Sequence, residues 1–264
     1  MPRISVASMA RYLVVAACFA ISSSFVLAQY QPPPTRDPAA LAVLNQAIVA
    51  MGGLSAVTSI QTIQVQGHMT LRDSGENSSF QLSYLIANNG VRFSRSKTTS
   101  KGVSIFGSGK GVPFLSLPNG RTETFGHHMA TAVPYEHPAL AILLDIQNTN
   151  YSITMAPPSK DGFIRIHAED DTSDDSRSTS PQDWYLDPST YVPARVEYKL
   201  PDAFHPSVTQ FTACKYLSYQ LAGTEIVPSS IEVDDSDGAV ADIKLDAFTF
   251  NVTLTDNFDM PGGN

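Results

Sequence analysis

Histidine side chains are the residues of this chain best suited to metal chemistry. His127 and His128 are adjacent, and His137 follows nine residues later, directly after Glu136. Imidazole and carboxylate groups are zinc ligands, so this stretch is the strongest metal candidate in the sequence. Adjacent side chains point apart on a strand or a helix, however, and the chain contains no H-E-x-x-H motif. We therefore predict histidines in a turn before a helix, and no metal site.

Two loops have the composition of ligand-binding motifs but lack the residues that would bind. The glycine-rich run 102–111 has the spacing of a phosphate-binding loop, yet Ser108 stands where that loop requires lysine. The acidic stretch 234–238 is similar to a calcium loop, yet Val233 and Lys244 would occupy positions that require carboxylates. No serine lies in a G-x-S-x-G elbow. We predict no cofactor, no metal and no catalytic site, hence a protein that is not an enzyme.

The first 28 residues have the composition of a secretory signal peptide. Arg3 and Arg11 accompany an apolar stretch, 12–27, and Ala28 is a small residue at the cleavage position. We predict cleavage after Ala28 and an exported protein, periplasmic or extracellular, with a bacterial envelope favoured. A membrane anchor is the first alternative, disfavoured because serines interrupt a run shorter than the roughly 20 residues of a spanning helix. Lipidation of Cys18, which follows a weak cleavage box, is the second.

The mature chain, 29–264, would keep a single cysteine and an acidic charge. Cys214 cannot form an intrachain disulfide, and its strand-like surroundings predict a small buried hydrophobic residue rather than a nucleophile. Removing two arginines from 17 basic residues leaves 15 against 25 acidic ones, a formal charge of −10. Such a charge repels phosphate backbones and anionic lipid surfaces. We therefore predict no nucleic acid partner and no stable membrane insertion after cleavage; the oligomeric state is left open.

Hydrophobic periodicity predicts two helices and many strands within one domain. Residues 29–37 are proline-rich and predict an extended tether, whereas 38–264 shows no composition break. Ala39–Met51 and Tyr135–Ile146 have apolar residues at helical spacing, the second nearly all round. Asn-Gly or Asp-Gly pairs predict turns at three positions, 89–90, 119–120 and 237–238. Runs of period two predict strands at 63–71, 80–86, 91–93, 103–106, 112–117, 151–155, 163–168, 184–186, 192–200, 208–217, 226–233 and 239–250.

Strands at this spacing, interrupted by two helices, predict a mainly β (α+β) domain. We expect an antiparallel sheet that curls around the helices, because each apolar strand face must be covered. The acidic stretch 169–175 is expected to be a solvated loop between strands.

The order of these features is similar to that of a known superfamily. The helix ending at Met51-Gly52-Gly53-Leu54, the strand 59–67, the segment 183–198 and the strand 226–231 lead to an end at 250–261. This order resembles the periplasmic lipoprotein-carrier superfamily (LolA/LolB-like fold), in particular its secreted bacterial members, over roughly residues 38–261. The resemblance implies an incomplete antiparallel β-barrel, a curved sheet wrapped around an N-terminal and a mid-chain helix. Relatives enclose an apolar cavity and bind lipids or lipid-modified proteins there. No functional side chain of the true carriers is matched onto a position here.

We therefore expect an exported, non-catalytic binding protein for a hydrophobic ligand, a lipid or the acyl chain of a lipidated protein. Burial contributes about 0.8 kcal/mol per methylene, so a 16-carbon chain contributes on the order of 12 kcal/mol before the costs of ordering and association. Two alternatives stay open: an envelope protein-interaction or sensor module with a fully packed interior, and a hydrolase with an unfamiliar site. The expected cavity lining, each member of which also suits an ordinary core, is Val65, Met69, Leu82, Tyr84, Phe93, Leu140, Leu143 and Leu144.

Overall fold

The computed structural model describes most of the chain after the expected signal peptide. The described residues are 33–87, 90–109, 112–124, 133–170, 181–201, 209–236, 238–254 and 258. The chain divides into two units, Met1–Pro33 and Pro34–Asn264, and every helix and strand below belongs to the second. The expected signal peptide with Cys18, the first four residues of the tether (29–32) and the pair His127-His128 lie outside the described residues.

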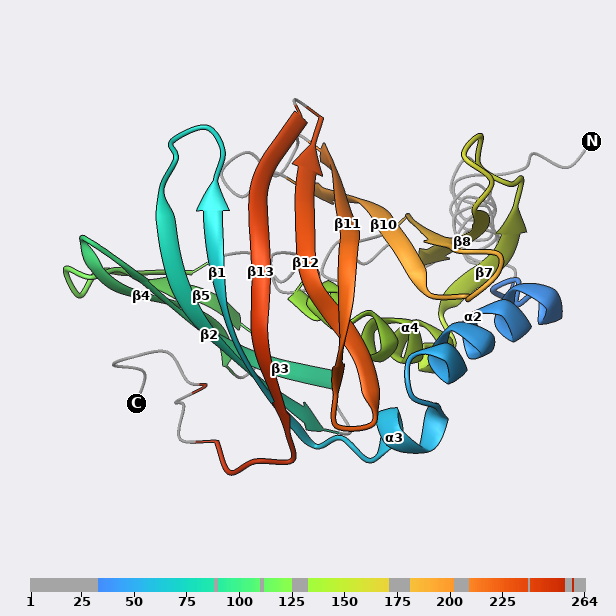
Figure 1. Cartoon of the computed structure of the whole chain (residues 1–264), viewed down its shortest axis with the longest axis horizontal. Helices are drawn as coiled ribbons and strands as arrows, with labels where there is room; N and C mark the ends of the chain where they lie inside the picture. Colours follow the sequence, from blue (N-terminus) through green and yellow to red (C-terminus); the bar gives the residue numbers. More distant parts are fainter. Residues whose placement is uncertain are drawn as a thin grey trace, which may run out of the picture. The chain divides into compact units, whose positions relative to one another are not determined.

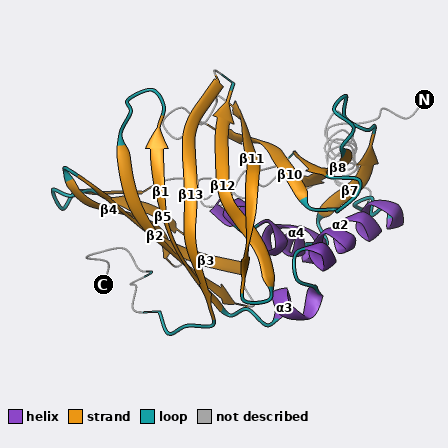
Figure 2. Ribbon diagram, viewed as in Figure 1, coloured by secondary structure: helices purple, strands orange, loops and turns teal. Residues whose placement is uncertain are grey.

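Thirteen strands of the described residues form one antiparallel sheet (Figures 1 and 2). From β1 the chain proceeds outward to the edge strand β6, and after the mid-chain helix it returns from the other edge, β7, inward to β13. β1 and β13 pair with each other and join the two halves. The strands are β1 (Thr62–Leu71), β2 (Asn77–Ala87), β3 (Gly90–Thr99), β4 (Gly102–Gly109), β5 (Val112–Ser116), β6 (Thr122–Thr124), β7 (Tyr151–Ala156), β8 (Ile164–Asp170), β9 (Gln182–Leu186), β10 (Pro193–Pro201), β11 (Thr209–Ala222), β12 (Glu225–Asp235) and β13 (Gly238–Phe250).

The sheet is curved and does not close, because the edge strands β6 and β7 stand at opposite ends of the strand order. Its alternation follows the sequence: Ile63 and Val65 are buried, whereas Gln66 and His68 are exposed. The predicted incomplete antiparallel β-barrel is therefore confirmed, with its helices on the apolar face of the sheet (Figure 2).

Both predicted helices are present. α2 (Pro38–Ala50) begins at Asp37, whose side chain accepts a hydrogen bond of 2.8 Å from the Ala39 N–H. α4 (Pro138–Gln147) follows a 3-10 turn, η2 (Val133–Glu136), and buries residues nearly all round, as the sequence predicts. α2 packs against α4 and β7. Among the described residues, no helix has both the length and the apolar composition needed to cross a bilayer.

The segment before α2 is bonded to the edge strand β7. Arg36 forms a parallel bridge with Ile153, and the Thr35 N–H donates to the Ser152 hydroxyl at 2.9 Å. The Arg36 guanidinium also donates to the carbonyl oxygens of Ile146 at 2.5 Å and Asn148 at 2.8 Å. A cation at these carbonyls compensates the negative end of α4. The last residues assigned to the tether thus help to hold α4.

Several elements differ from the sequence prediction, each for a local reason. The short helix α3 (Leu54–Thr58) and the strand β6 were not predicted, because five and three residues are too few to show a period. β11 continues five residues past Leu217, because bulges near Ser218 interrupt its alternation. The predicted strand 103–106 is too short, since β4 extends to Gly109 within the glycine-rich run. A Cβ at Gly107 would lie 2.9 Å from the Phe114 ring, so packing rather than a turn requires this glycine.

One of the three predicted turns lies entirely within the described residues. Asn89 and Asp237 lie outside the described residues. Gly120 has φ +81°, a backbone conformation that glycine adopts readily, and it follows Asn119 in the turn between β5 and β6. Within the acidic stretch 234–238, Asp234 and Asp235 end β12, and Gly238, at φ +124°, begins β13. The predicted Asn119-Gly120 turn is therefore confirmed.

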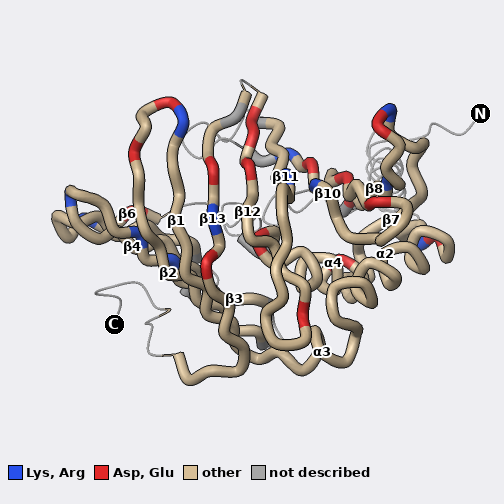
Figure 3. The backbone as a smooth tube through the Cα atoms, in the orientation of Figure 1, with Lys and Arg blue, Asp and Glu red and all other residues tan. Residues whose placement is uncertain are grey.

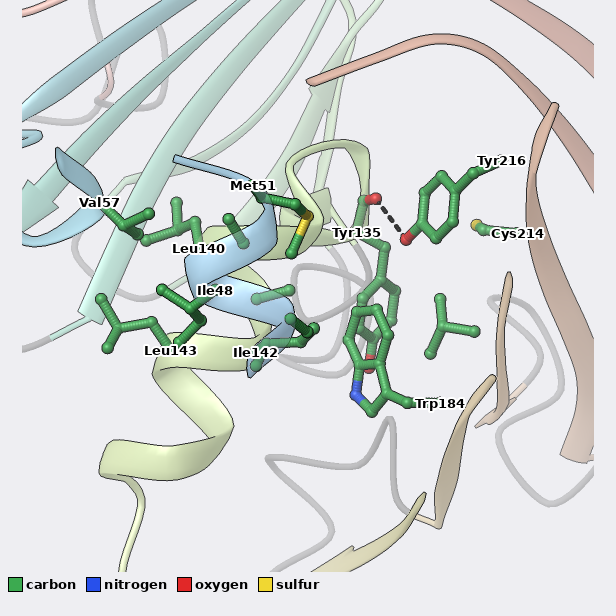
Figure 4. Packing of buried hydrophobic residues seen from close by; sticks show 14 of the residues in the cluster. Ile48, Met51, Val57, Tyr135, Leu140, Ile142, Leu143, Trp184, Cys214 and Tyr216 are labelled. Carbon is green, nitrogen blue, oxygen red and sulfur yellow. Dashed lines mark hydrogen bonds between the residues drawn. The ribbon is translucent and has the colours of Figure 1, made fainter. Parts of the chain in front are cut away.

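The core lies between the sheet and the helices. Figure 4 shows Ile48 of α2 and Leu140 of α4 packed together, with Trp184 and Tyr135 beside them. The Tyr216 hydroxyl donates to the Tyr135 carbonyl at 2.8 Å and connects β11 to η2. Cys214 is buried in this cluster, and burial raises the pKa of its thiol to about 12. It is the small buried hydrophobic residue that the sequence predicts.

Candidate functional site

The register of β1, β2 and β3 places large apolar side chains on one face of the sheet. Val65 is opposite Leu82, and Ile63 is opposite Tyr84, which in turn is opposite Phe93. These side chains belong to one hydrophobic cluster with residues of α2 and α4. We call this face of the sheet the interior face, and the opposite one the outer face.

The eight residues expected to line a cavity all lie in or against this cluster. Val65, Leu82, Tyr84, Phe93, Leu140 and Leu143 are buried, and Met69 and Leu144 are partly buried and packed against them. The fold therefore brings all eight together, from β1, β2, β3 and α4. Contact of any of them with a ligand stays a prediction.

The apolar interior continues into side chains that reach solvent. These residues pack against the buried cluster while remaining partly exposed, and they come mainly from β1 to β4, β13 and the second half of α4. An apolar molecule arriving from solvent would meet this rim before the fully buried core. The rim residues of these elements are Met69, Ile86, Val91, Phe106, Leu144, Ile146, Phe248 and Phe250.

A buried ion pair lies on the interior face. Arg95 of β3 is opposite Leu82 and Phe106, so its side chain belongs to the apolar face. Its guanidinium donates to the Glu136 carboxylate of η2 and lies 5.4 Å from the centroid of the Phe80 ring. Burial raises the pKa of Glu136, and the Arg95 charge opposes that rise.

A second buried polar contact holds the beginning of α4. His137 Nδ1 accepts a hydrogen bond of 3.1 Å from the Leu140 N–H, so His137 is the N-cap of the helix. An accepting Nδ1 places the ring proton on Nε2, which donates to the Glu225 carboxylate at 3.1 Å. The His137 and Phe250 rings meet edge to face, with 5.9 Å between their centroids. The position and hydrogen bonds of His137 are those of a cap.

A third buried group joins α4 to β9. Asp145 accepts a hydrogen bond of 3.0 Å from Trp184 Nε1. Burial raises the pKa of Asp145 to about 7, against the opposing effect of the Gln182 and Trp184 side chains. Close by, the Tyr135 hydroxyl donates to the Gln182 side-chain oxygen. The helix is thus held on the sheet by polar contacts as well as by apolar packing.

Charged residues recur along β12 and β13 (Figure 3), and they alternate there with buried apolar residues such as Ile231 and Ile243, which places them on the outer face. Arg72 donates to Asp242 at 2.8 Å and to Glu232 at 2.5 Å, and Lys215 donates to Glu232 at 3.0 Å. These groups are partly exposed, so solvent screens each pair and its contribution to stability is small. The large hydrophobic cluster therefore lies on the interior face, whereas these ion pairs of the central strands lie on the outer face.

Sequence reasoning missed the charged residues of the interior. Arg95 occupies an apolar phase of β3, in step with Val91 and Phe93, and this break in the period was the available signal. Glu136 was noted only as a neighbour of His137, and Asp145 and Glu225 carried no pattern at all. Their partners lie on distant segments, 41 residues apart for Arg95 and Glu136.

Metal chemistry finds no support in the part of the chain that the structure describes. There, no group of three or more His, Cys, Asp or Glu side chains is arranged to hold an ion. The acidic stretch 234–238 instead contributes Asp234 to an ion pair with Lys215. The pair His127-His128 is outside the described residues.

Comparison with known proteins gives no match by sequence and several by structure. No family model matches the chain, and no curated protein sequence matches it. A domain from Vibrio parahaemolyticus with a proposed role in outer membrane lipoprotein sorting is 13% identical and has a TM-score of 0.54, covering 82% of this chain and 94% of its own. A DUF1329 family protein from Desulfovibrio piger is 14% identical, with a TM-score of 0.55 over 85% of this chain and 98% of its own.

A third solved structure carries the superfamily name. A LolA superfamily protein from Nitrosomonas europaea is 12% identical and has a TM-score of 0.53, covering 81% of this chain and 94% of its own. At such low identity the likeness concerns the fold. With its open, curved antiparallel sheet around two helices, the chain has the fold of the LolA superfamily.

Proposed function

We propose that this chain is an exported, non-catalytic protein that binds a hydrophobic ligand, a lipid or the acyl chain of a lipidated protein, between the interior face and the helices. The observation that carries the proposal is the continuity of the apolar interior with a partly exposed apolar rim. Met69 of β1 and Leu144 of α4 belong to that rim and pack against the buried cluster. The shared fold with a lipoprotein-sorting domain is further support.

Energetics favour such a ligand. A 16-carbon chain contributes on the order of 12 kcal/mol of transfer free energy, and ordering and association costs reduce this to an affinity that permits release. Methionine at the rim suits ligands of variable shape, because its side chain is unbranched and flexible. The net binding free energy therefore stays below that transfer figure, and we expect a Kd in the micromolar range, about 8 kcal/mol.

Native mass spectrometry and lipid extraction of the purified mature protein, 29–264, test the proposal. We expect co-purifying lipid, or saturable uptake of a fluorescent fatty acid by the delipidated protein. Leu144→Gln, which places an amide in the rim, should weaken uptake by about tenfold, the equivalent of roughly 1.4 kcal/mol. Leu217→Gln is the matched control, because Leu217 is 59% exposed and does not belong to the cluster. Repeated absence of lipid and of uptake would remove the proposal.

A packed interior is the second candidate, and one observation favours it. Six of the eight expected lining residues are buried within the cluster itself, as an ordinary core requires. In that case the protein would be an envelope interaction or sensor module, binding a partner through its surface. Failure to take up any apolar ligand, together with retention of a specific envelope protein, would favour this function over lipid binding.

A further inference from the structure

Cationic side chains on the interior face of β3 are the feature that the function above does not explain. The alternation of β3 runs through Val91 and Phe93 to Arg95 and Lys97, so two cations continue an apolar series. Lys97 donates to Glu76 at 2.9 Å, and its side chain is 25% exposed. Arg95 is deeper, with 18% of its side chain exposed, and it meets the Glu136 carboxylate.

The ion pair between Arg95 and Glu136 is only partly satisfied. A guanidinium has five N–H donors in a fork that matches a carboxylate or a phosphate in two-point fashion. Here one guanidinium nitrogen meets one carboxylate oxygen, and Arg95 Nε and Glu136 Oε2 are buried without a hydrogen-bond partner among the described residues. The Glu136 side chain is 91% buried, given its exposed fraction of 9%. The buried Arg95 Nε carries a desolvation cost that an oxyanion bound in two-point fashion would relieve.

Arg95 combines a cationic group with apolar neighbours, as a site for an anionic headgroup attached to an apolar chain requires. Phe80 lies under the guanidinium, and Leu82 and Phe106 flank it on the neighbouring strands. The long-range field of an acidic protein repels anions, so any preference for one must come from a local cation in a poorly hydrated place. A ligand whose chain lies along the interior face would bring its headgroup to such a place.

We propose that Arg95 binds the oxyanion headgroup of an amphiphilic ligand, and that Glu136 occupies the same donors until the ligand displaces it. The inference rests on the proposed function, since it assigns the headgroup position of that same ligand. The carboxylate of a fatty acid and the phosphate of a phospholipid share the required chemistry. No covalent step is involved: one oxyanion replaces another on the guanidinium. Glu136, whose pKa burial raises, takes up a proton from solvent when it loses the cation.

Three ligands with the same 16-carbon chain separate headgroup from chain: palmitate, hexadecyl phosphate and hexadecanol. The affinity of each ligand is measured by its displacement of the uncharged dye Nile red from the mature protein, at concentrations below those at which micelles form. We expect palmitate or hexadecyl phosphate, or both, to bind at least about tenfold tighter than hexadecanol, the worth of one hydrogen bond to a charged group. The arm with the larger preference identifies the headgroup as carboxylate or phosphate.

Two variants test the residues. Glu136→Gln removes the internal competitor. It should increase the affinity ratio of the anionic ligand to hexadecanol by about tenfold over that of the native chain. The double variant Arg95→Gln with Glu136→Gln removes both charges, leaves no buried charge unpaired, and should bind all three ligands alike. Arg165→Gln is the control, because Arg165 lies on the outer face in an ion pair with Asp183 at 2.7 Å. The thermal unfolding midpoint of each variant shows that it is folded.

The outcomes distinguish the two levels of the proposal. Equal binding of the three ligands by the native chain and by all variants would overturn the headgroup assignment and leave hydrophobic binding standing. Binding of none of the ligands, with Nile red also excluded, would overturn the proposed function and this inference with it. A preference that survives in the double variant would place the headgroup elsewhere and overturn the assignment to Arg95.

Discussion

Asp145 is a carboxyl group enclosed between α4 and β9, and its ionisation opposes folding. Burial raises the pKa of Asp145 from 3.8 to about 7, so the folded protein holds this proton more tightly than the unfolded chain does. Between these values the folded state binds more protons, and stability therefore falls as the pH rises. The penalty is absent below the unfolded pKa and fully present above about pH 7.

Asp145→Asn should remove this penalty. The amide oxygen still accepts from Trp184 Nε1, so the variant should be more stable than the native chain, with a gain that grows by roughly 3 kcal/mol from pH 5 to pH 8. Trp184 is the single tryptophan of the chain and contacts Asp145, so its fluorescence reports the unfolding directly. A stability difference that stays constant over this pH range would show that Asp145 titrates normally.

His137 should act as a helix cap and as the partner of a buried acid. His137→Ala removes the acceptor for Leu140 N–H and leaves Glu225 without its donor, so we expect a loss of about 3 kcal/mol in the free energy of unfolding. His137→Asn restores the cap and should recover about 1 kcal/mol of this loss. Chemical denaturation measures both.

The contact between His137 and Glu225 can be isolated by a double-mutant cycle. His137→Ala combined with Glu225→Gln should cost less than the sum of the two single changes, because the amide tolerates the loss of the imidazole better than a buried carboxylate does. Strict additivity would mean that the two side chains do not interact. The pair spans 88 residues, and such pairings are tertiary; no sequence spacing could have predicted this one.

Individual strands and helices were predictable wherever one face is buried. β1 alternates buried and exposed residues as its sequence does, and α4 is apolar all round because neighbouring elements cover it on most sides. β11 was predicted too short, because its bulges shift the period. α3 and β6 depend on their neighbours rather than on their own residues. Local pattern therefore accounts for most of the elements, and pairing decides their ends.

Gly67 shows how one element depends on a missing side chain. It lies at a bulge between β1 and β13, where an added Cβ would be 2.3 Å from the Lys244 carbonyl oxygen and 2.7 Å from Phe80 Cζ. Gly67→Ala should therefore destabilise the protein by about 3 kcal/mol, since backbone must move to make room. Gln66→Ala, at an exposed position beside it, should change stability by less than about 0.5 kcal/mol in the same thermal or denaturant assay. Equal effects of the two substitutions would mean that the close approach at Gly67 is absent in solution.

At the scale of the whole molecule, the open sheet leaves an apolar interior face that the helices cover. Strand spacing predicted the curled antiparallel sheet, and the resemblance in the order of elements implied the incomplete barrel, although solved structures of similar fold are only 12–14% identical to this chain. The sequence did not predict the charged groups inside, Arg95 and Glu136 among them, because their burial follows from the packing of η2 on the sheet. The expected lining was predictable as an apolar set, and its role requires a ligand experiment.

Ligand binding should stabilise the folded molecule as a whole. A ligand present at 100 times its Kd adds about 2.7 kcal/mol to the free energy of unfolding. For a domain of this size that corresponds to a rise of roughly 5 to 10 °C in Tm. Differential scanning fluorimetry of delipidated protein with palmitate or hexadecanol measures the shift. An unchanged Tm at saturating ligand would contradict binding to the folded state.

Photo-crosslinking tests the central claim most directly, because it locates the ligand. A 16-carbon fatty acid with a diazirine at the end of its chain is irradiated with the mature protein, and labelled peptides are identified by mass spectrometry. The account predicts labels on β1, β2, β3 and α4, lost when excess unlabelled palmitate is present. Labels confined to outer-face residues, or labelling that excess palmitate does not prevent, would contradict it.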